Sequence, residues 1–177
     1  QMFHLGADIG SGNRNALGLG VVDDLLDHVV VAGLFEVGRA LPRADILARL
    51  QSIDHQNRIA SSYLLLYAAN GGQEVGAEVE KFILREERSI TGTRAMAAVL
   101  IANGESGLKK LEAAIVTKRS WDELDNLVIA INILVGKEMS PRDPAAKFLK
   151  RAIQLDWEGE RATIVRSRAE RILAKLQ

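Results

Sequence analysis

Four glycines recur at nearly constant intervals along this chain of 177 residues. Gly38, Gly71, Gly104 and Gly136 are separated by 33, 33 and 32 residues, and each follows an apolar run. Glycine readily takes the left-handed backbone conformation that ends many helices. We therefore interpret each glycine as the end of one helix in a repeated unit. An interval near 33 residues is typical of proteins built from stacked helix pairs.

The segments on either side of these glycines have the periodicity of helices. Apolar residues recur at intervals of three and four, which is the spacing of one helix face. The segment before each glycine is apolar almost all round, whereas the segment after it is amphipathic, so the two should occupy different environments. The expected first helices are residues 21–37, 56–70, 91–103 and 123–135. The expected second helices are residues 43–53, 78–87, 107–116 and 144–155.

The predicted fold is all-α: an α-solenoid of about four antiparallel helix pairs with a C-terminal capping helix at 158–177. Residues 21–177 would form this single domain, after a glycine-rich lead at residues 1–20. The capping helix should cover the apolar face of the last pair, because a terminal repeat lacks a neighbour on one side. The covered residues would be Ala145, Phe148, Leu149, Ala152 and Ile153, beneath Val165, Ala169, Ile172, Leu173 and Leu176.

The fourth unit resembles a known repeat family. The stretch "DPAAKFLKRAIQLDWEGERA", residues 143–162, is similar to the second helix of a tetratricopeptide repeat that continues into the next unit. Ala145, Leu149 and Ala152 fall on that family's small–large–small positions. The first helices lack the family's tryptophan and tyrosine pattern, and the other units also resemble degenerate HEAT repeats. The resemblance implies a scaffold that binds another protein.

Composition excludes several classes of site and gives no overall charge. There is no cysteine, which rules out disulfides and cysteine-based metal sites. Basic and acidic residues number 23 each. We expect no cofactor and no bound metal. We also expect no membrane-spanning helix, since no stretch reaches roughly 18 uncharged apolar residues. The sequence begins without a signal-peptide pattern, so a cytoplasmic location is the expectation.

The N-terminal lead contains one motif that suggests a nucleotide site. Residues 8–13, "DIGSGN", resemble the first phosphate-binding hairpin of the actin-like ATPases. Those enzymes need a second phosphate hairpin and a further lobe, and no such pattern follows Asp24. A single glycine-rich match is weak evidence. Nucleotide binding at this segment is therefore the weakest of three functional hypotheses.

Three polar side chains on the predicted first helices are candidates for contact with a partner. Tyr63 and Tyr67 are one turn apart, so they would share a helix face. Both could line the groove of a repeat array, although packing in the core is the favoured interpretation. Asn132 lies within the apolar run "IAINILVG", where it must find a polar partner between repeats or face the groove.

The C-terminal helix carries a cluster of positive charge. Residues 141–177 contain nine basic and five acidic side chains. At 100° per residue, Arg161, Arg168, Arg171 and Lys175 fall along one flank. This basic flank could hold an acidic peptide or a phosphate backbone. The favoured interpretation is an ordinary solvated flank, whose four basic side chains could be replaced by alanine with little effect on folding.

These observations favour a non-enzymatic protein–protein interaction module of adaptor, chaperone or inhibitor type. Repeat arrays present long surfaces that hold a peptide or a helix of a partner. The alternative is nucleic-acid binding through the basic flank, and we do not expect nucleic acid to be the main partner because the net charge is zero.

Overall fold

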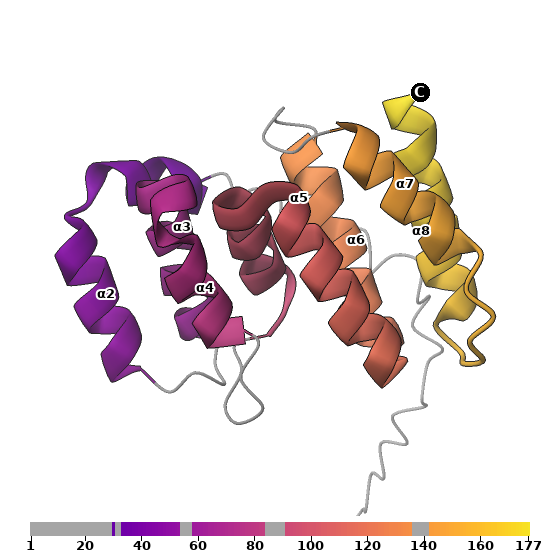
Figure 1. Cartoon of the computed structure of the whole chain (residues 1–177), viewed down its shortest axis with the longest axis horizontal. Coiled ribbons are helices and arrows are strands. Elements are labelled where there is room, and N and C mark those ends of the chain that lie inside the picture. Colours follow the sequence, from indigo (N-terminus) through magenta and orange to yellow (C-terminus); the bar gives the residue numbers. More distant parts are fainter. Residues whose placement is uncertain (1–29, 31–32, 54–57, 84–90, 136–141) are drawn as a thin grey trace, which may run out of the picture.

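The computed structural model describes residue 30 and residues 33–53, 58–83, 91–135 and 142–177 (Figure 1). Within these ranges the chain is helical and contains no strand, so the all-α prediction is confirmed for the described part. The N-terminal lead at residues 1–20 and Gly136 lie outside the described residues.

Within the described ranges seven α-helices follow one another, and residues 33–40 are helical as well. Their bounds are α2 Arg43–Ser52, α3 Arg58–Gly71, α4 Gly76–Ile83, α5 Thr93–Lys118, α6 Trp121–Val135, α7 Arg142–Ile153 and α8 Ala162–Leu176. A short 3-10 helix, η1 Gly72–Val75, joins α3 to α4.

Helix α5 contains both members of the predicted third pair. Its backbone leaves the helical region at Gly104, where φ is 55° and ψ is −131°, so the helix divides at that residue. The ribbon turns back on itself at this point (Figure 1). A side chain other than glycine would adopt this backbone only with strain. The third pair is therefore residues 93–103 and 105–118.

Gly38 differs from the expectation. The helix continues through Gly38 to Ala40, and the bend comes before Pro42, which precedes the first turn of α2. A Cβ atom at Gly38 would lie 2.6 Å from the carbonyl oxygen of Leu66. Glycine is required here because the helix backbone approaches α3 closely, and not because the helix ends.

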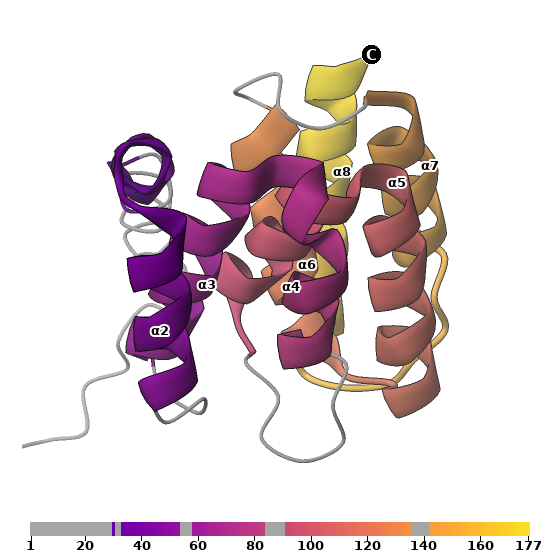
Figure 2. The same cartoon turned by 60° about the vertical axis from the view of Figure 1, so that its left-hand side comes forward.

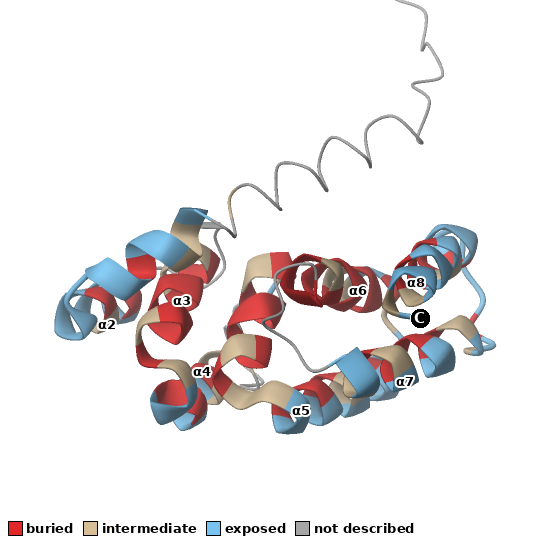
Figure 3. Ribbon diagram, turned by 90° about the horizontal axis from the view of Figure 1, so that it is seen from above, coloured by how far each residue is buried: buried red, intermediate tan, exposed pale blue. Residues whose placement is uncertain are grey.

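The helices form two layers when the molecule is viewed from above. Figure 3 shows α6 and α8 on one side and α4, the second half of α5 and α7 on the other. Packing proceeds along the chain: α2 contacts α3, α3 contacts α5, α5 contacts α6, and α6 and α7 both contact α8.

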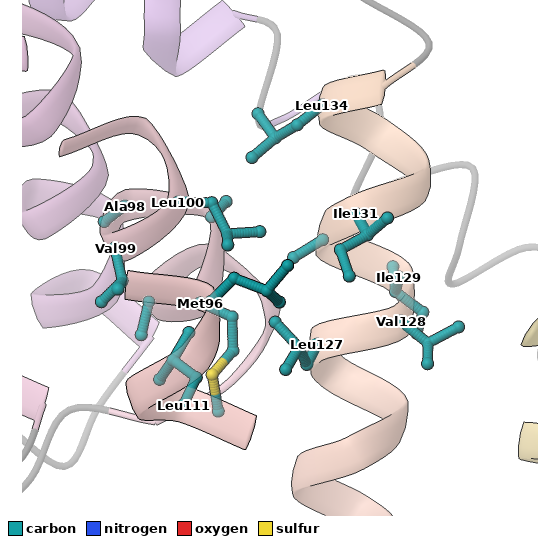
Figure 4. Close-up of a cluster of buried hydrophobic side chains, with 14 of the residues drawn as sticks. Met96, Ala98, Val99, Leu100, Leu111, Leu127, Val128, Ile129, Ile131 and Leu134 are labelled. Carbon is teal, nitrogen blue, oxygen red and sulfur yellow. The ribbon is translucent and has the colours of Figure 1, made fainter. Parts of the chain in front are cut away.

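The core is centred on the interface of α5 with α6. Met96, Leu100 and Leu111 of α5 lie opposite Leu127 and Ile131 of α6 (Figure 4). Each of these side chains is at most 4% exposed. Burying such a side chain stabilises the fold by about 1.5–3 kcal/mol. This explains why the first helices are apolar on several sides: they have neighbours in both directions.

Candidate partner-binding surface

The two predicted tyrosines have different surroundings. Tyr67 is 4% exposed and belongs to the core, whereas Tyr63 is partly exposed and packs against the core from outside. Burial raises the pKa of Tyr67, the negative charge of Glu78 raises it further, and Arg43 opposes both effects. Of the pair, only Tyr63 is placed to contact a partner.

Tyr63 lies in a row of partly exposed residues on consecutive first helices. Arg94 on α5 donates a 2.9 Å hydrogen bond from its guanidinium to Ser62 Oγ on α3. Thr93 on α5 donates a 3.1 Å hydrogen bond from Oγ1 to Asn126 Oδ1 on α6. These two part-buried bonds connect α3, α5 and α6. We call this row the first-helix stripe: Ile59, Ser62, Tyr63, Arg94, Ile101 and Asn126.

The first-helix stripe is mostly uncharged and contains an exposed apolar side chain. Ile59, in the first turn of α3, is 56% exposed. Tyrosine and arginine are residue types that interfaces favour. The residues of the stripe provide an aliphatic side chain, an aromatic ring, amide and hydroxyl groups and a guanidinium.

The second helices present a very different surface. Lys110 contacts Glu80 at 2.6 Å, and Arg151 makes two hydrogen bonds of 2.6 and 2.7 Å to the carboxylate of Glu112. The hydrogen bond to Glu112 raises the pKa of Arg151. Such charge pairs between neighbouring second helices are typical of a solvated face, where each pair contributes about 0–1 kcal/mol.

Asn132 does not lie in line with the stripe. It follows Asn126 by six positions on α6, which turns it by about 120° around the helix. It shares its flank with Asp125, seven positions earlier, and Asp125 faces α8 through an ion pair with Arg168. Asn132 is partly exposed. Asn132 therefore lies on a different flank of α6 from Asn126.

The basic flank of α8 is not one exposed surface. Arg168 is buried and donates a hydrogen bond to Asp125, and Arg161 pairs with Asp122 at the start of α6. Arg171 and Lys175 are exposed. The expectation that the whole flank is solvated is wrong, because α6 supplies a carboxylate under α8. A sequence pattern within one helix cannot reveal a partner 43 residues away.

A cluster of aromatic and cationic side chains holds the corner between α7 and α8, and the sequence analysis did not single it out. The rings of Trp121 and Trp157 meet edge to face with centroids 5.3 Å apart. Trp121 Nε1 donates a 3.1 Å hydrogen bond to the carbonyl of Glu158. The guanidinium of Arg166 lies 5.3 Å from the centre of the Trp121 ring and also bonds to the carbonyl of Leu155. The chain contains only two tryptophans, and this scarcity was the one sign in the sequence that could have drawn attention to them.

The remaining sequence hypotheses concern other parts of the chain. The motif at residues 8–13 lies outside the described residues. Among the residues that the structure describes, no three histidine or acidic side chains are grouped as a metal would need. None of the described helices has the length and hydropathy to span a membrane. No family model, curated protein or solved structure matches this chain.

Proposed function

We propose that this chain is a helical-repeat protein of stacked helix pairs that binds another protein through the first-helix stripe. In this proposal the fold is an α-solenoid of about four pairs, capped by α8, and it is similar to tetratricopeptide or HEAT arrays. Its role is that of a non-enzymatic adaptor, chaperone or inhibitor.

Hydrogen bonds between consecutive units support the repeat. Asn70 Nδ2 donates to the carbonyl of Gly38, 32 residues earlier, and Arg94 bonds to Ser62 over the same separation. Thr93 bonds to Asn126 over 33 residues. Each bond joins one first helix to the next, and the separation matches the spacing of the four glycines. The coincidence of these two intervals is the observation that carries the proposal.

The contrast between the two layers supports the choice of surface. The second helices pair their charges with one another, as in Lys110 with Glu80, and so present a solvated face. The stripe instead leaves Ile59 exposed next to Tyr63, and burial of such side chains on binding favours association. The proposed occupant is a peptide or helix of the partner laid across α3, α5 and α6.

Site-specific photo-crosslinking tests this proposal. A photoreactive phenylalanine analogue replaces Tyr63 in one variant and Lys109, on an exposed second-helix position, in the control. We expect a discrete crosslinked protein partner from position 63 and none from position 109, with the crosslinked peptide identified by mass spectrometry. Equal yields from both positions, or adducts from the second-helix position alone, would contradict the choice of surface.

The basic flank is a weaker basis for nucleic-acid binding than the sequence indicated. Two of its four side chains are engaged by Asp122 and Asp125. Each phosphate contact adds roughly −0.9 to the log–log salt slope for duplex DNA. Arg171 and Lys175 alone would therefore give a shallow salt dependence, and we do not propose nucleic acid as the partner.

A further inference from the structure

In the described part of the chain, helix α8 packs against α6 and α7, and its Arg166 also bonds to the carbonyl of Leu155 in the connection that precedes it (Figures 1 and 2). Phe148 and Leu149 of α7 and Val165 and Ala169 of α8 are each at most 1% exposed. Arg168 of α8 adds a buried ion pair with Asp125 of α6. The surface under α8 is thus complementary to α8 in both shape and charge. None of these contacts depends on α8 belonging to the same chain as α6 and α7.

The conformation of the connection between α7 and α8 determines whether α8 packs on its own copy or on another. Trp157 and Glu158 are attached to Trp121 of α6, as described above, so the chain is anchored up to residue 158. Gly159 follows with a φ of 143°, and its carbonyl accepts a 3.1 Å hydrogen bond from the amide of Ala162. This turn directs the chain back into α8.

Gly159 is restricted to glycine by its conformation and by its neighbours. Residues with a Cβ atom rarely adopt its positive φ. A Cβ atom there would also lie 3.0 Å from Trp121 Cδ1. Straightening residues 159–161, beyond the anchored Glu158, would extend the connection to roughly 10 Å. The anchor of Trp157 on Trp121 and the docking of Arg168 on Asp125 would both survive this change.

We propose that α8 exchanges between two copies of this chain, and that Gly159 is the hinge that holds it on its own copy. The exchanged state is a symmetric dimer in which each α8 occupies the other copy's surface between α6 and α7. Exchange of an identical element keeps the contacts of α8 with α6 and α7, so the difference between the two states is confined to the hinge, which includes the Arg161–Asp122 ion pair.

A hinge substitution tests the proposal in one step. Gly159→Val penalises the turn, and it leaves the straightened connection unstrained. Glycine-only backbone costs other residues at least about 1 kcal/mol per chain, so relief in both chains raises the dimerisation constant by roughly thirtyfold or more. The control is Gly92→Val, at the start of α5, where the glycine has a φ of 99° and open space around the position. Size-exclusion chromatography with light scattering over a concentration series measures the dimerisation constant of both variants.

A charge exchange tests the docking of α8 in trans without altering the hinge. In Asp125→Arg, two arginines face each other beneath α8, and in Arg168→Asp two aspartates do. Mixing the two variants restores opposite charges at both sites only if each α8 docks on the other chain. We expect the mixture to form a dimer that contains one copy of each variant and melts at a higher temperature than either variant alone.

Two results would overturn the proposal. One is a folded Gly159→Val variant that stays monomeric over the whole concentration series, like Gly92→Val. The other is a mixture of the charge variants that behaves as the sum of its components. The charge exchange decides the question if Gly159→Val does not fold.

Discussion

The buried ion pair between Arg168 and Asp125 gives the sharpest prediction about stability. Their side chains are 10% and 9% exposed, so both charges have left bulk water. Removing one partner leaves the other charge buried without compensation, which costs about 3–5 kcal/mol. We therefore expect Arg168→Met to lose a large share of a typical total of 5–15 kcal/mol. For a chain of this size the midpoint of thermal unfolding would fall by roughly 6 to 20 °C.

The double variant Arg168→Met/Asp125→Ala separates the loss of a pair from the loss of packing. Replacing both members of a buried pair with apolar residues is often neutral, so the double variant should be more stable than Arg168→Met alone. The matched control is Arg171→Met, an exposed arginine three positions further on, which should change stability by no more than about 0.5 kcal/mol. Urea unfolding of all three variants measures the free energies. An Arg168→Met variant within about 1 kcal/mol of the wild type would refute the reasoning.

Three further predictions concern other parts of the chain. Gly38→Ala should destabilise the protein, because its Cβ atom would meet the Leu66 carbonyl. Gly33→Ala has open space around it and should be neutral or slightly stabilising. Urea unfolding compares the two variants, and equal changes in the free energy of unfolding would contradict the close approach at Gly38. Because the pKa of Tyr67 is raised, its contribution is fully present below pH 10 and is lost as the pH rises through the folded-state pKa. As the pH rises above about 10, the melting temperature of Tyr67→Phe should therefore fall less than that of the wild type. Equal falls in the two melting temperatures would refute this. Truncation after Asp156 removes α8 and should cause self-association through the exposed face, seen by size-exclusion chromatography; a monomer with an unchanged melting temperature would show that α8 contributes nothing.

The helices could be predicted from the sequence because each carries its own periodicity. The expected segment 43–53 became α2 at Arg43–Ser52, and Phe148 of α7 and Val165 of α8 are both buried. Local chemistry also explains where α6 begins, since Ser120 Oγ accepts a 3.3 Å hydrogen bond from the amide of Glu123. Signals that lie within one turn or one helix face are visible in the sequence.

The candidate site was less predictable because it depends on contacts between distant residues. The helix wheel placed Arg168 on a solvated flank, and only the tertiary structure shows Asp125 beneath it. Tyr63 and Tyr67 share a helix face by spacing, yet only Tyr67 is enclosed by neighbouring helices. Gly38 fitted the repeat interval, but its role is the close approach of two backbones.

A binding constant tests most directly whether a partner binds on the first-helix stripe. The partner segment identified by crosslinking at position 63 would be synthesised and titrated calorimetrically into three proteins: the wild type, Ile59→Asp and the control Lys147→Asp on exposed α7. Ile59 is 56% exposed, so a charge there should leave the fold intact while it disrupts an apolar contact. We predict that Ile59→Asp weakens binding at least about tenfold, or 1.4 kcal/mol, and that Lys147→Asp leaves Kd nearly unchanged. Equal Kd values for Ile59→Asp and the wild type would contradict the account.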